Sequence, residues 1–580
     1  MDELFLDPLK YYETEAKGKI LGNSDDYFED LLKKSGIDAD ANRESAKKYR
    51  TENETVNTLN GKISKYKALR VLMILLSIVG VILFFVGIFS VSAYVGVGIA
   101  LIIGGAALVA FSIYFWFGKI NKIIKDSSSV RDEHRKKADE YLKECQAQVA
   151  PLNSMFDNTD TFKVIEKTLP EIKFNSLYTP KHEKFLIEHY DFAPIEDENI
   201  SVMNVLSGTF ASNPFLYYRY KRHTLGTQTY VGTLTIHWTE TYTDRDGRTR
   251  TRTRTQTLTA SVTKPKPFYT IHTTLGFGAQ AAPDLSFSRS PSHAERFSEK
   301  SLERKVNSGA KKLEKQARKA TSHGGNFQEM ANSEFDVLFG ARDRNNEVQF
   351  RVMYTPLAQR NTTDLMKSAT GYGDDFYFAK QGRFNMVSSE HAASWKMNTS
   401  ASNYYSYDVD IIKKNFIDFN AGYFKSVYFD FAPLIAIPVY TEEPSFSLDN
   451  TYESPSNYTA YEHETLANAI GKDAFVHKNS STDAILKTEF SEKQGSSDIL
   501  SVTAHSYETF NRVDIIPVLG GDGRIHGVPV PWIEYIPLEN TVNMSVKDLN
   551  MSEKEFASSN QSANSSENWA FCHGMIANII

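Results

Sequence analysis

The hydrophobic pattern is dominated by one uncharged run, which extends from Val71 to Gly118. This span contains no Asp, Glu, Lys, Arg or His, and a single bilayer crossing needs only about 20 apolar residues. Small and polar residues interrupt the run at SVSAY, residues 90–94. The pattern therefore predicts a transmembrane helical hairpin over residues 69–118, with helices at about 69–90 and 94–117.

Basic residues flank the predicted hairpin on both sides, and its short turn carries no charge. They are Lys62, Lys65, Lys67 and Arg70 before the first helix, and Lys119, Lys122 and Lys125 after the second. Because positively charged flanks stay in the cytoplasm, we expect a multi-pass membrane protein with both termini cytoplasmic. No ionisable residue lies within the span, so we interpret the hairpin as an anchor in the lipid bilayer and not as a channel.

Small residues recur at four-residue spacing in the second predicted helix, at Gly96, Ala100 and Gly104. This spacing keeps one helix face small enough for a neighbouring backbone to approach closely. We favour helix packing within the hairpin, where Gly80 and Gly87 of the first helix would face these positions. A homo-oligomer formed through the same face is the alternative.

The segments at 41–68 and 119–150 are rich in Lys, Glu, Ala and Gln and are predicted to be helices. In the first, Tyr49, Val56 and Ile63 recur at seven-residue spacing. The two segments could pair as an antiparallel coiled-coil stalk of about 40 Å, at 1.5 Å per residue. Alternatively, both pack on the soluble region. Pro151 is expected to end the second helix.

Beyond Pro151 the pattern changes to short runs rich in Val, Ile, Thr, Tyr and Phe, separated by Gly, Pro, Asn and Asp. Such runs are typical of β-strands. The expected fold class is a membrane helical hairpin with flanking cytosolic helices, plus a large β-rich α+β soluble region. Its other parts are an N-terminal cytosolic segment at 1–40, a β-rich α+β cytosolic domain at 155–410, a second β-rich region at 411–550 and a polar tail at 551–580.

Residues 228–262 give the clearest hairpin signal, because polar and apolar residues alternate on both sides of the turn sequence RDG. A three-residue loop, with Gly247 in the left-handed conformation, sets the register. The residues then predicted to face each other are Tyr242 and Arg250, Glu240 and Arg252, and Trp238 and Arg254. A two-residue loop would lose the ion pair and the cation–π contacts, so we predict the three-residue register.

This hairpin places four arginines on one strand face, namely Arg248, Arg250, Arg252 and Arg254. They form a candidate basic ridge for the phosphate groups of lipid or nucleic acid. The other interpretation, which we favour, is a solvated hairpin whose arginines are neutralised by Glu240 and neighbouring aromatic residues.

A second basic segment covers residues 293–320, where apolar residues recur at helical spacing. The pattern predicts an amphipathic helix with a basic outer face. That face would carry Lys300, Arg304, Lys311, Lys315 and Arg318. The helix either lies on an anionic membrane surface or packs on the sheet, and we favour packing.

Residues 334–389 are expected to form strand, turn, strand, a helix after Thr355-Pro356, and two strands joined at Gln381-Gly382. With the upstream segments FKVIEKTLPEIKF and VLSGTF and the membrane hairpin, this order resembles a broad group of uncharacterised bacterial two-transmembrane-helix membrane proteins with a cytosolic domain of unknown function. The resemblance covers about 330 residues. It implies a bacterial inner-membrane topology and no chemistry. The apolar run at 428–440 further predicts a buried strand.

Composition narrows the function classes. The net charge is −6, so the chain as a whole does not have the basic field of a nucleic-acid-binding protein. Only two cysteines are present, Cys145 and Cys572, which excludes a disulfide framework and a cysteine-based zinc site. No cofactor or metal is predicted.

No strong catalytic motif occurs in the sequence: GxSxG, GxxxxGK[ST], HExxH and a complete GxGxxG are all missing. The first hypothesis is a membrane-anchored binding or scaffold module that acts through protein partners. A membrane-tethered hydrolase or lipid-acting enzyme is the second, and a sensor of anionic lipid surfaces is the third. A deep pocket that contains two or more of His182, His189, His391, Asp374, Asp375 and Arg254 would support the second, and their dispersion over the surface would contradict it.

Overall fold

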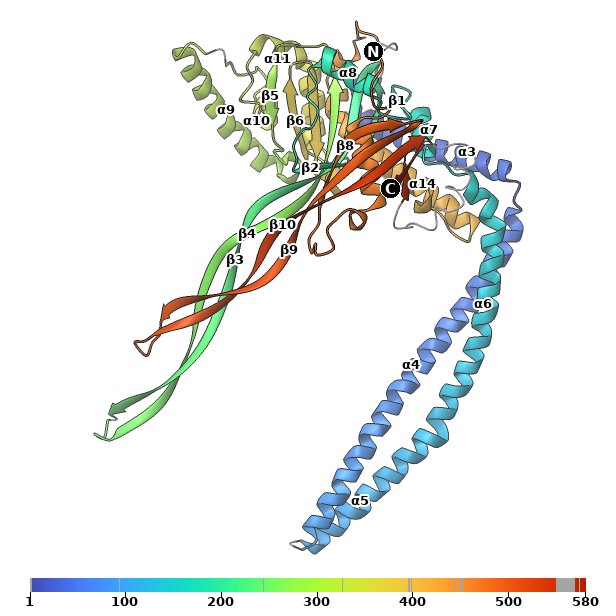
Figure 1. Ribbon diagram of the computed structural model, residues 1–580, viewed down its shortest axis with the longest axis vertical. Helices are drawn as coiled ribbons and strands as arrows, with labels where there is room; N and C mark the ends of the chain where they lie inside the picture. Colours follow the sequence, from blue (N-terminus) through green and yellow to red (C-terminus); the bar gives the residue numbers. More distant parts are fainter. Residues whose placement is uncertain are drawn as a thin grey trace. The chain divides into compact units, whose positions relative to one another are not determined.

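The computed structural model forms two compact units. One unit consists of Met1–Ser24, Asp157–Ser400 and Asn420–Ile580, and the other of Asp25–Phe156 and Ala401–Phe419. The described residues are 3–92, 94–243, 245–325, 327–394, 397, 399–442, 444–448, 452–548, 569–572 and 574–580. The predicted combination of two long apolar helices with a large β-rich region is confirmed (Figure 1).

The smaller unit is built around long antiparallel helices. They are α4 (Ala39–Ser90), α5 (Val95–Ile113), the π-helical turn η2 (Tyr114–Ile120) and α6 (Asn121–Met155). The side chain of Asp38 accepts a hydrogen bond from the Ala41 amide and so caps the start of α4. By length and composition, α4 and the helix from Val95 to Met155 are each apolar enough to cross a membrane.

Glycines allow α4 and α5 to approach closely. A Cβ atom at Gly105 would lie 2.6 Å from the Gly80 carbonyl oxygen, and one at Gly87 would lie 2.8 Å from the Ile102 amide nitrogen. Gly98 is also buried against α4. These positions repeat every seven residues, which keeps them on one face of a left-handed helix pair.

The predicted packing face of α5 is not the one that contacts α4. Gly96, Ala100 and Gly104 are exposed, and a Cβ atom at Gly96 or Gly104 would have no neighbour within 4 Å. Gly98 lies two residues further, about 200° around the helix from Gly96. The four-residue spacing therefore marks the uncovered side of α5.

The helices α4 and α6 pair with each other along their length. Val56, Ile63 and Cys145 are buried between them. Polar contacts include Ser45 Oγ to Glu144 Oε1 at 2.9 Å. The prediction that Pro151 ends the second helix is wrong, because α6 continues to Met155. Leu152 is buried and Phe156 packs on Tyr404, which holds this last turn in place.

The larger unit contains a seven-stranded antiparallel sheet in the order β1-β2-β3-β4-β7-β6-β5. Its strands are β1 (Ile172–Phe174), β2 (Ile200–Phe210), β3 (Asn213–Thr243), β4 (Thr249–Gly278), β5 (Ser286–Arg289), β6 (Phe376–Gln381) and β7 (Phe384–Ser389). Helix α14 (Val409–Ile435) covers one face, where Phe431 contacts Phe210 and Phe215. The other face packs on α8 (Pro180–Tyr190) and α15 (Ala460–Ile470).

A second sheet has the order β11-β12-β10-β9-β8. Its strands are β8 (Ile485–Gln494), β9 (Ser497–Leu519), β10 (Ile525–Asp548), β11 (Trp569–Cys572) and β12 (Met575–Ile579). Helix α15 contacts both sheets: Glu464 accepts a hydrogen bond from the Val202 amide of β2 and pairs with Lys487 of β8. Of the predicted polar tail, 551–568 lie outside the described residues, and the end of the chain joins this sheet.

The predicted N-terminal segment is mostly helical from Glu3 onwards, and its first helices belong to the core of the larger unit. The elements are α1 (Glu3–Leu6), α2 (Pro8–Tyr11), η1 (Tyr12–Ala16) and α3 (Lys17–Ser35). Phe5 packs on Phe210, and the Tyr428 hydroxyl donates to the Pro8 carbonyl. The remaining helices are α7 (Asp160–Thr168), η3 (Ala294–Arg296), α9 (Glu299–Ser322), α13 (Glu390–Ser394), η4 (Ala401–Asn403) and η6 (Lys472–Ala474).

Two predictions of strands are wrong. Residues 334–353 form the helices α10 (Ser333–Phe339) and α11 (Glu347–Met353), each started by an asparagine side chain that caps the backbone. The run at 428–440 is the end of α14 followed by the 3-10 turn η5 (Pro438–Thr441). That end of α14 is buried on all sides and Asp430 is its only charged residue, so it lacks the alternation of polar and apolar positions that reveals a helical period. Helix α12 (Pro356–Lys367) and the β6–β7 turn match the prediction.

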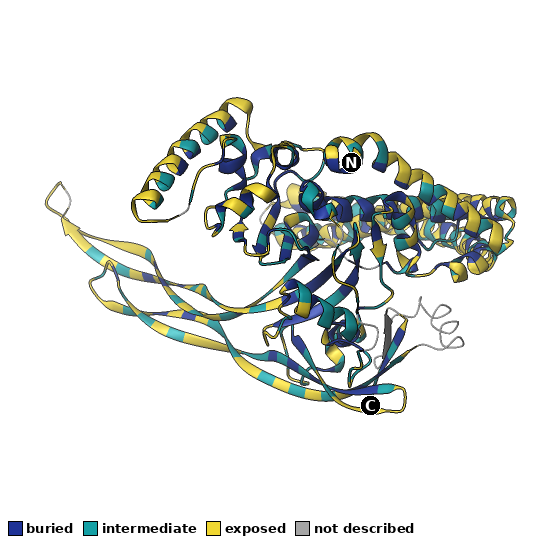
Figure 2. Ribbon diagram, turned by 90° about the horizontal axis from the view of Figure 1, so that it is seen from above, coloured by how far each residue is buried: buried dark blue, intermediate teal, exposed yellow. Residues whose placement is uncertain are grey.

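The predicted register of the 228–262 hairpin is confirmed. Tyr242 pairs with Arg250, Glu240 with Arg252 and Trp238 with Arg254, and Gly247 has a φ of +76°. Beyond the pair Arg222–Thr270, β3 and β4 extend past the rest of the sheet as a ribbon. Beyond the pair His505–Glu539, β9 and β10 do the same. We call residues 223–269 and 506–538 together the arm (Figures 1 and 2).

The two ribbons of the arm stack on each other. Their shared apolar cluster contains Ile236, Leu258, Ala260, Val528 and Val530. Beside it, Lys264 lies 2.8 Å from Asp514 and 4.2 Å from the centre of the Trp532 ring. At Gly232 the backbones approach so closely that a Cβ atom would lie 2.0 Å from the Pro529 carbonyl oxygen. A glycine is therefore required at this crossing.

Replacing Gly232 with valine should separate the ribbons, because the added side chain has no room. We expect a local cost of about 2 kcal/mol, equal to about a thirtyfold rise in opening. Hydrogen exchange of the full chain should then accelerate across 255–262 and 526–532. The control Thr233→Val changes the exposed face next to it and should leave exchange unaltered. Equal exchange in Gly232→Val and wild type would contradict this packing.

Candidate functional site

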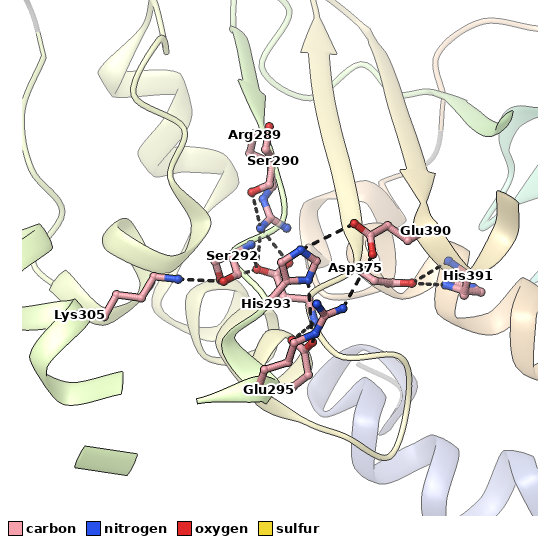
Figure 3. Close-up of polar contacts among 11 residues, drawn as sticks. Arg289, Ser290, Ser292, His293, Glu295, Lys305, Asp375, Glu390 and His391 are labelled. Atoms are coloured by element: carbon pink, nitrogen blue, oxygen red, sulfur yellow. Dashed lines mark hydrogen bonds and ion pairs between the residues drawn. The ribbon is translucent and has the colours of Figure 1, made fainter. Parts of the chain in front are cut away.

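Acidic, basic and hydroxyl side chains gather at the edge of the seven-stranded sheet near the start of β6 (Figure 3). Arg289 comes from the end of β5, and Ser292 and His293 come from the loop before η3. Asp374 and Asp375 precede β6, and Glu390 and His391 begin α13. We call this group the polar cluster. It contains three of the six residues that the enzyme hypothesis required.

Asp374 forms the buried half of the polar cluster. Its carboxylate pairs with the Arg289 guanidinium at 2.8 Å, and both side chains are fully buried. The amide and the hydroxyl of Ser292 donate to the same carboxylate, at 2.6 and 2.5 Å. Burial lowers the pKa of Arg289, and the charge of Asp374 opposes that shift. Three donors thus converge on Oδ2 of this carboxylate, and together they hold the β5 loop against β6.

His391 lies between two carboxylates. Its Nδ1 is 2.7 Å from Asp375 Oδ2 and its Nε2 is 3.4 Å from Asp430 Oδ1 on α14. The Tyr217 hydroxyl of β3 donates to Asp430 in turn. The ring of Tyr372 stacks on the imidazole with centroids 3.7 Å apart. This chain of contacts ties β3, β6, α13 and α14 together.

The electrostatics favour a charged histidine at this position. Burial alone would lower the pKa of His391, but the hydrogen bond that its ring donates to Asp375 and the charge of Asp430 outweigh burial and raise the pKa. Burial also raises the pKa of Asp430, although His391 opposes that shift. An imidazolium that donates from both nitrogens has no lone pair with which to accept a proton. His391 is therefore placed to hold charge, and it is poorly placed to act as a general base.

The outer rim of the polar cluster carries His293, Glu390 and Arg296. His293 has a φ of +52°, a left-handed conformation that is uncommon outside glycine. Its Nε2 is 3.7 Å from Glu390 Oε1, and Arg296 is 3.9 Å from the same carboxylate group. At these distances the contacts contribute little to stability, and the Arg296–Glu390 ion pair lies on an exposed surface.

The other candidate catalytic residues lie elsewhere. The His182 ring caps the start of α8 beside Thr179. His189 stacks on Phe446 with centroids 4.4 Å apart. Arg254 lies in the arm, bonded to Glu240 at 2.8 Å. Sequence reasoning missed Arg289, Asp430 and Tyr217, because their partners are distant along the chain and no local motif connects them.

The two predicted basic surfaces are both present in the larger unit. Arg252 and Arg254 share Glu240, and the Arg252 guanidinium also lies 5.3 Å from the centre of the Tyr242 ring. Arg248 and Arg250 are exposed further towards the turn. Helix α9 packs through Leu302, Gly309 and Leu313. Its exposed side chains include all five predicted ones, Lys300, Arg304, Lys311, Lys315 and Arg318.

The β9–β10 ribbon carries an apolar surface that sequence reasoning did not identify. Its side facing β3–β4 is covered, and its other side is exposed. We call this side the outer face; it consists of the cross-strand pairs Val513–Pro531, Ile515–Pro529, Pro517–Gly527 and Leu519–Ile525. Ile515 is 63% exposed and Ile525 is 72% exposed. The outer face has no charged residue, which is unusual for a surface exposed to water.

No family model, curated protein or solved structure matches the chain. Within the described residues, no group of three or more His, Cys, Asp and Glu side chains is arranged to hold a metal ion. Two surface hollows, one beside Asp410 and Lys413 and one beside Gln146 and Tyr405, contain none of the polar cluster.

The raised pKa of His391 predicts a pH-dependent contribution to stability. A protonated histidine held by two carboxylates stabilises the fold fully below its ordinary pKa of 6.5, and this contribution is lost as the pH rises through the raised pKa. His391→Gln should remove it. The difference in thermal midpoint between wild type and variant should be largest near pH 6 and shrink towards pH 9.

The thermal midpoints of the wild type and of His391→Gln are measured on the full chain in detergent. Taking the difference between the two midpoints removes the contribution of the other histidines, which both proteins share. His189→Gln is the matched control, since that ring stacks on Phe446 outside the polar cluster. This control should follow the wild type at every pH. A midpoint difference for His391→Gln that does not change with pH would contradict the charged state.

Proposed function

We propose that this protein is a membrane-anchored binding module, in which the apolar helices hold the chain in a bilayer and the arm binds a protein partner. The observation that carries the proposal is the outer face of the β9–β10 ribbon. It combines exposed aliphatic side chains with a complete lack of charge. Exposed apolar surfaces of this kind mark interaction sites in soluble domains.

The anchor is supported by the exposure of the apolar helices. Phe89 is 79% exposed and Ile103 is 64% exposed, whereas a core helix of a soluble protein would be covered. In the most apolar stretch of each of the two helices, only 17% of the residues are buried. A lipid environment would cover these side chains, and the helical backbone satisfies its own hydrogen bonds there. The basic flanks favour both termini in the cytoplasm, and the resemblance in element order to bacterial two-helix membrane proteins implies a bacterial inner membrane.

The polar cluster does not favour the enzyme hypothesis. Its two most buried groups, Arg289 and Asp374, are paired with each other, and His391 is held between carboxylates. A catalytic group must reach a substrate with a free donor or acceptor. These contacts are better suited to a rigid scaffold that supports the arm.

The topology can be tested with a reporter enzyme that works only in the cytoplasm. Fused after residue 580, it should be active, since the basic flanks keep both ends inside. Inserted after residue 92, in the turn between the helices, it should be inactive. An active reporter in the turn, or an inactive one at the C-terminus, would overturn the proposed orientation.

The binding role can be tested by photo-cross-linking in native membranes. A benzophenone amino acid at Ile515 places the reactive group on the outer face, and one at Thr235 places it on the exposed threonine face of β3. We expect a protein adduct from position 515 and at least tenfold less from position 235. Only lipid adducts, or equal protein adducts from both positions, would count against a protein-binding arm.

A further inference from the structure

The outer face has properties that limit what can cover it. Its eight residues lie in two antiparallel strands and form four cross-strand pairs. Charged partners gain nothing from it, because it offers no ion pair. An uncharged face can, however, meet an identical face without repulsion between like charges. The surface is therefore suited to self-association.

A lipid bilayer is a poor occupant of this face. The arm is a pair of two-stranded ribbons, so its edges carry backbone N–H and C=O groups that have no neighbouring strand. Hydrocarbon cannot satisfy such groups, which is why open β-sheet edges are not found in the lipid core. The apolar helices α4 and α5 do not have this problem, because each helix bonds its own backbone.

A strand added to the edge of the ribbon is also a poor occupant. Pro517, Pro529 and Pro531 each lie opposite a residue of the facing strand in the same alternate pairs. Proline has no N–H, so these must be the pairs whose backbone groups point outward. Within the outer face, three outward donors are thereby missing from the ribbon edges. Proline at such positions weakens edge-to-edge pairing, most of all along β10, and so favours stacking on the face as the route to association.

The other side of the same ribbon already shows this kind of stacking. Val528 and Val530 of β10 pack on Ile236 and Leu258 of the β3–β4 ribbon. For a ribbon with only one apolar side, that single contact would cover all of its apolar surface. The β9–β10 ribbon has a second apolar side, which a ribbon of matching composition would cover. A second copy of this chain supplies one.

We propose that the outer face binds the outer face of a second copy of this chain, so that two arms stack back to back across a two-fold axis. This inference rests on the proposed binding function and names its partner. In such an isologous contact the same residues serve both copies. The order of layers is β3–β4, β9–β10, β9–β10 of the second copy and β3–β4 of the second copy.

The area of the face sets the strength of the contact. With about 100 Å² for a fully buried aliphatic side chain, the outer face offers on the order of 500 Å² per copy. Two faces together then bury about 1,000 Å², which is the lower limit for a specific interface. We therefore expect a weak dimer that forms at the high local concentration of a membrane and dissociates on dilution in detergent.

The test uses two full-length copies with different epitope tags, expressed in one cell and isolated from native membranes after cross-linking from a benzophenone amino acid at Leu519, another residue of the outer face. The expected product contains both tags. Ile515→Glu in both copies should reduce co-isolation at least tenfold, because two carboxylates would meet. The controls Ile515→Leu and Thr235→Glu should keep it, and unchanged hydrogen exchange at 526–532 shows that the arm remains folded.

Mixed charges give the sharper measurement. One copy with Ile515→Lys and one with Ile515→Glu should associate at least fivefold more than either variant with itself, since only the mixed pair brings opposite charges together. Failure of the mixed pair to recover would overturn the stacking of two copies. An adduct with a different protein would overturn this inference and leave the proposed function standing. Lipid adducts alone would overturn both.

Discussion

A two-stranded β-ribbon has no interior, and this constraint determines the design of the arm. In water an isolated hairpin is marginally stable at best. The β3–β4 and β9–β10 ribbons extend far beyond their sheets, and each covers an apolar side of the other through Ile236, Leu258, Val528 and Val530. The crossing requires Gly232, and the pairing of Lys264 with Asp514 closes one margin. The stability of each ribbon therefore depends on the presence of the other.

The arm needs a rigid base, and buried polar contacts supply it. Two networks connect elements that are distant in sequence: Glu464 bridges the two sheets through Val202 and Lys487, and His391 joins Asp375 to Asp430. Removing one side chain of such a buried pair costs more stability than the pair itself contributes, because the remaining charge stays buried without a partner. The networks therefore define one arrangement of sheets and helices from which both ribbons project.

Local chemistry predicted some elements well, and tertiary contacts decided the rest. The turn sequence RDG and strict alternation determined the register of the β3–β4 hairpin before any contact was known. The short helices α10 and α11 were missed because their apolar runs also fit strands. The end of α14 was missed because it is buried all round. His391 joins Asp375 of the polar cluster to Asp430 of α14, and no local pattern predicts these contacts between separate elements of the chain. On α5 the sequence predicts close packing through small residues, but the four-residue spacing of Gly96, Ala100 and Gly104 points to the uncovered side, and Gly105 lies on the side that contacts α4.

The outer face of the arm and the uncovered side of α5 could both contribute to the proposed assembly of two copies. The outer face is too small for a tight dimer in dilute solution. An anchor that confines two copies to one membrane raises their effective concentration, so a weak contact becomes sufficient without any added surface. The uncovered positions Gly96, Ala100 and Gly104 on α5 leave room for a second helix to approach in the same membrane. If the outer-face contact and the α5 contact form between the same two copies, formation of either one makes the other an intramolecular step. The free energy of association through both contacts is then more favourable than through either contact alone. Loss of the anchor would then weaken the arm contact even though no residue of the arm has changed.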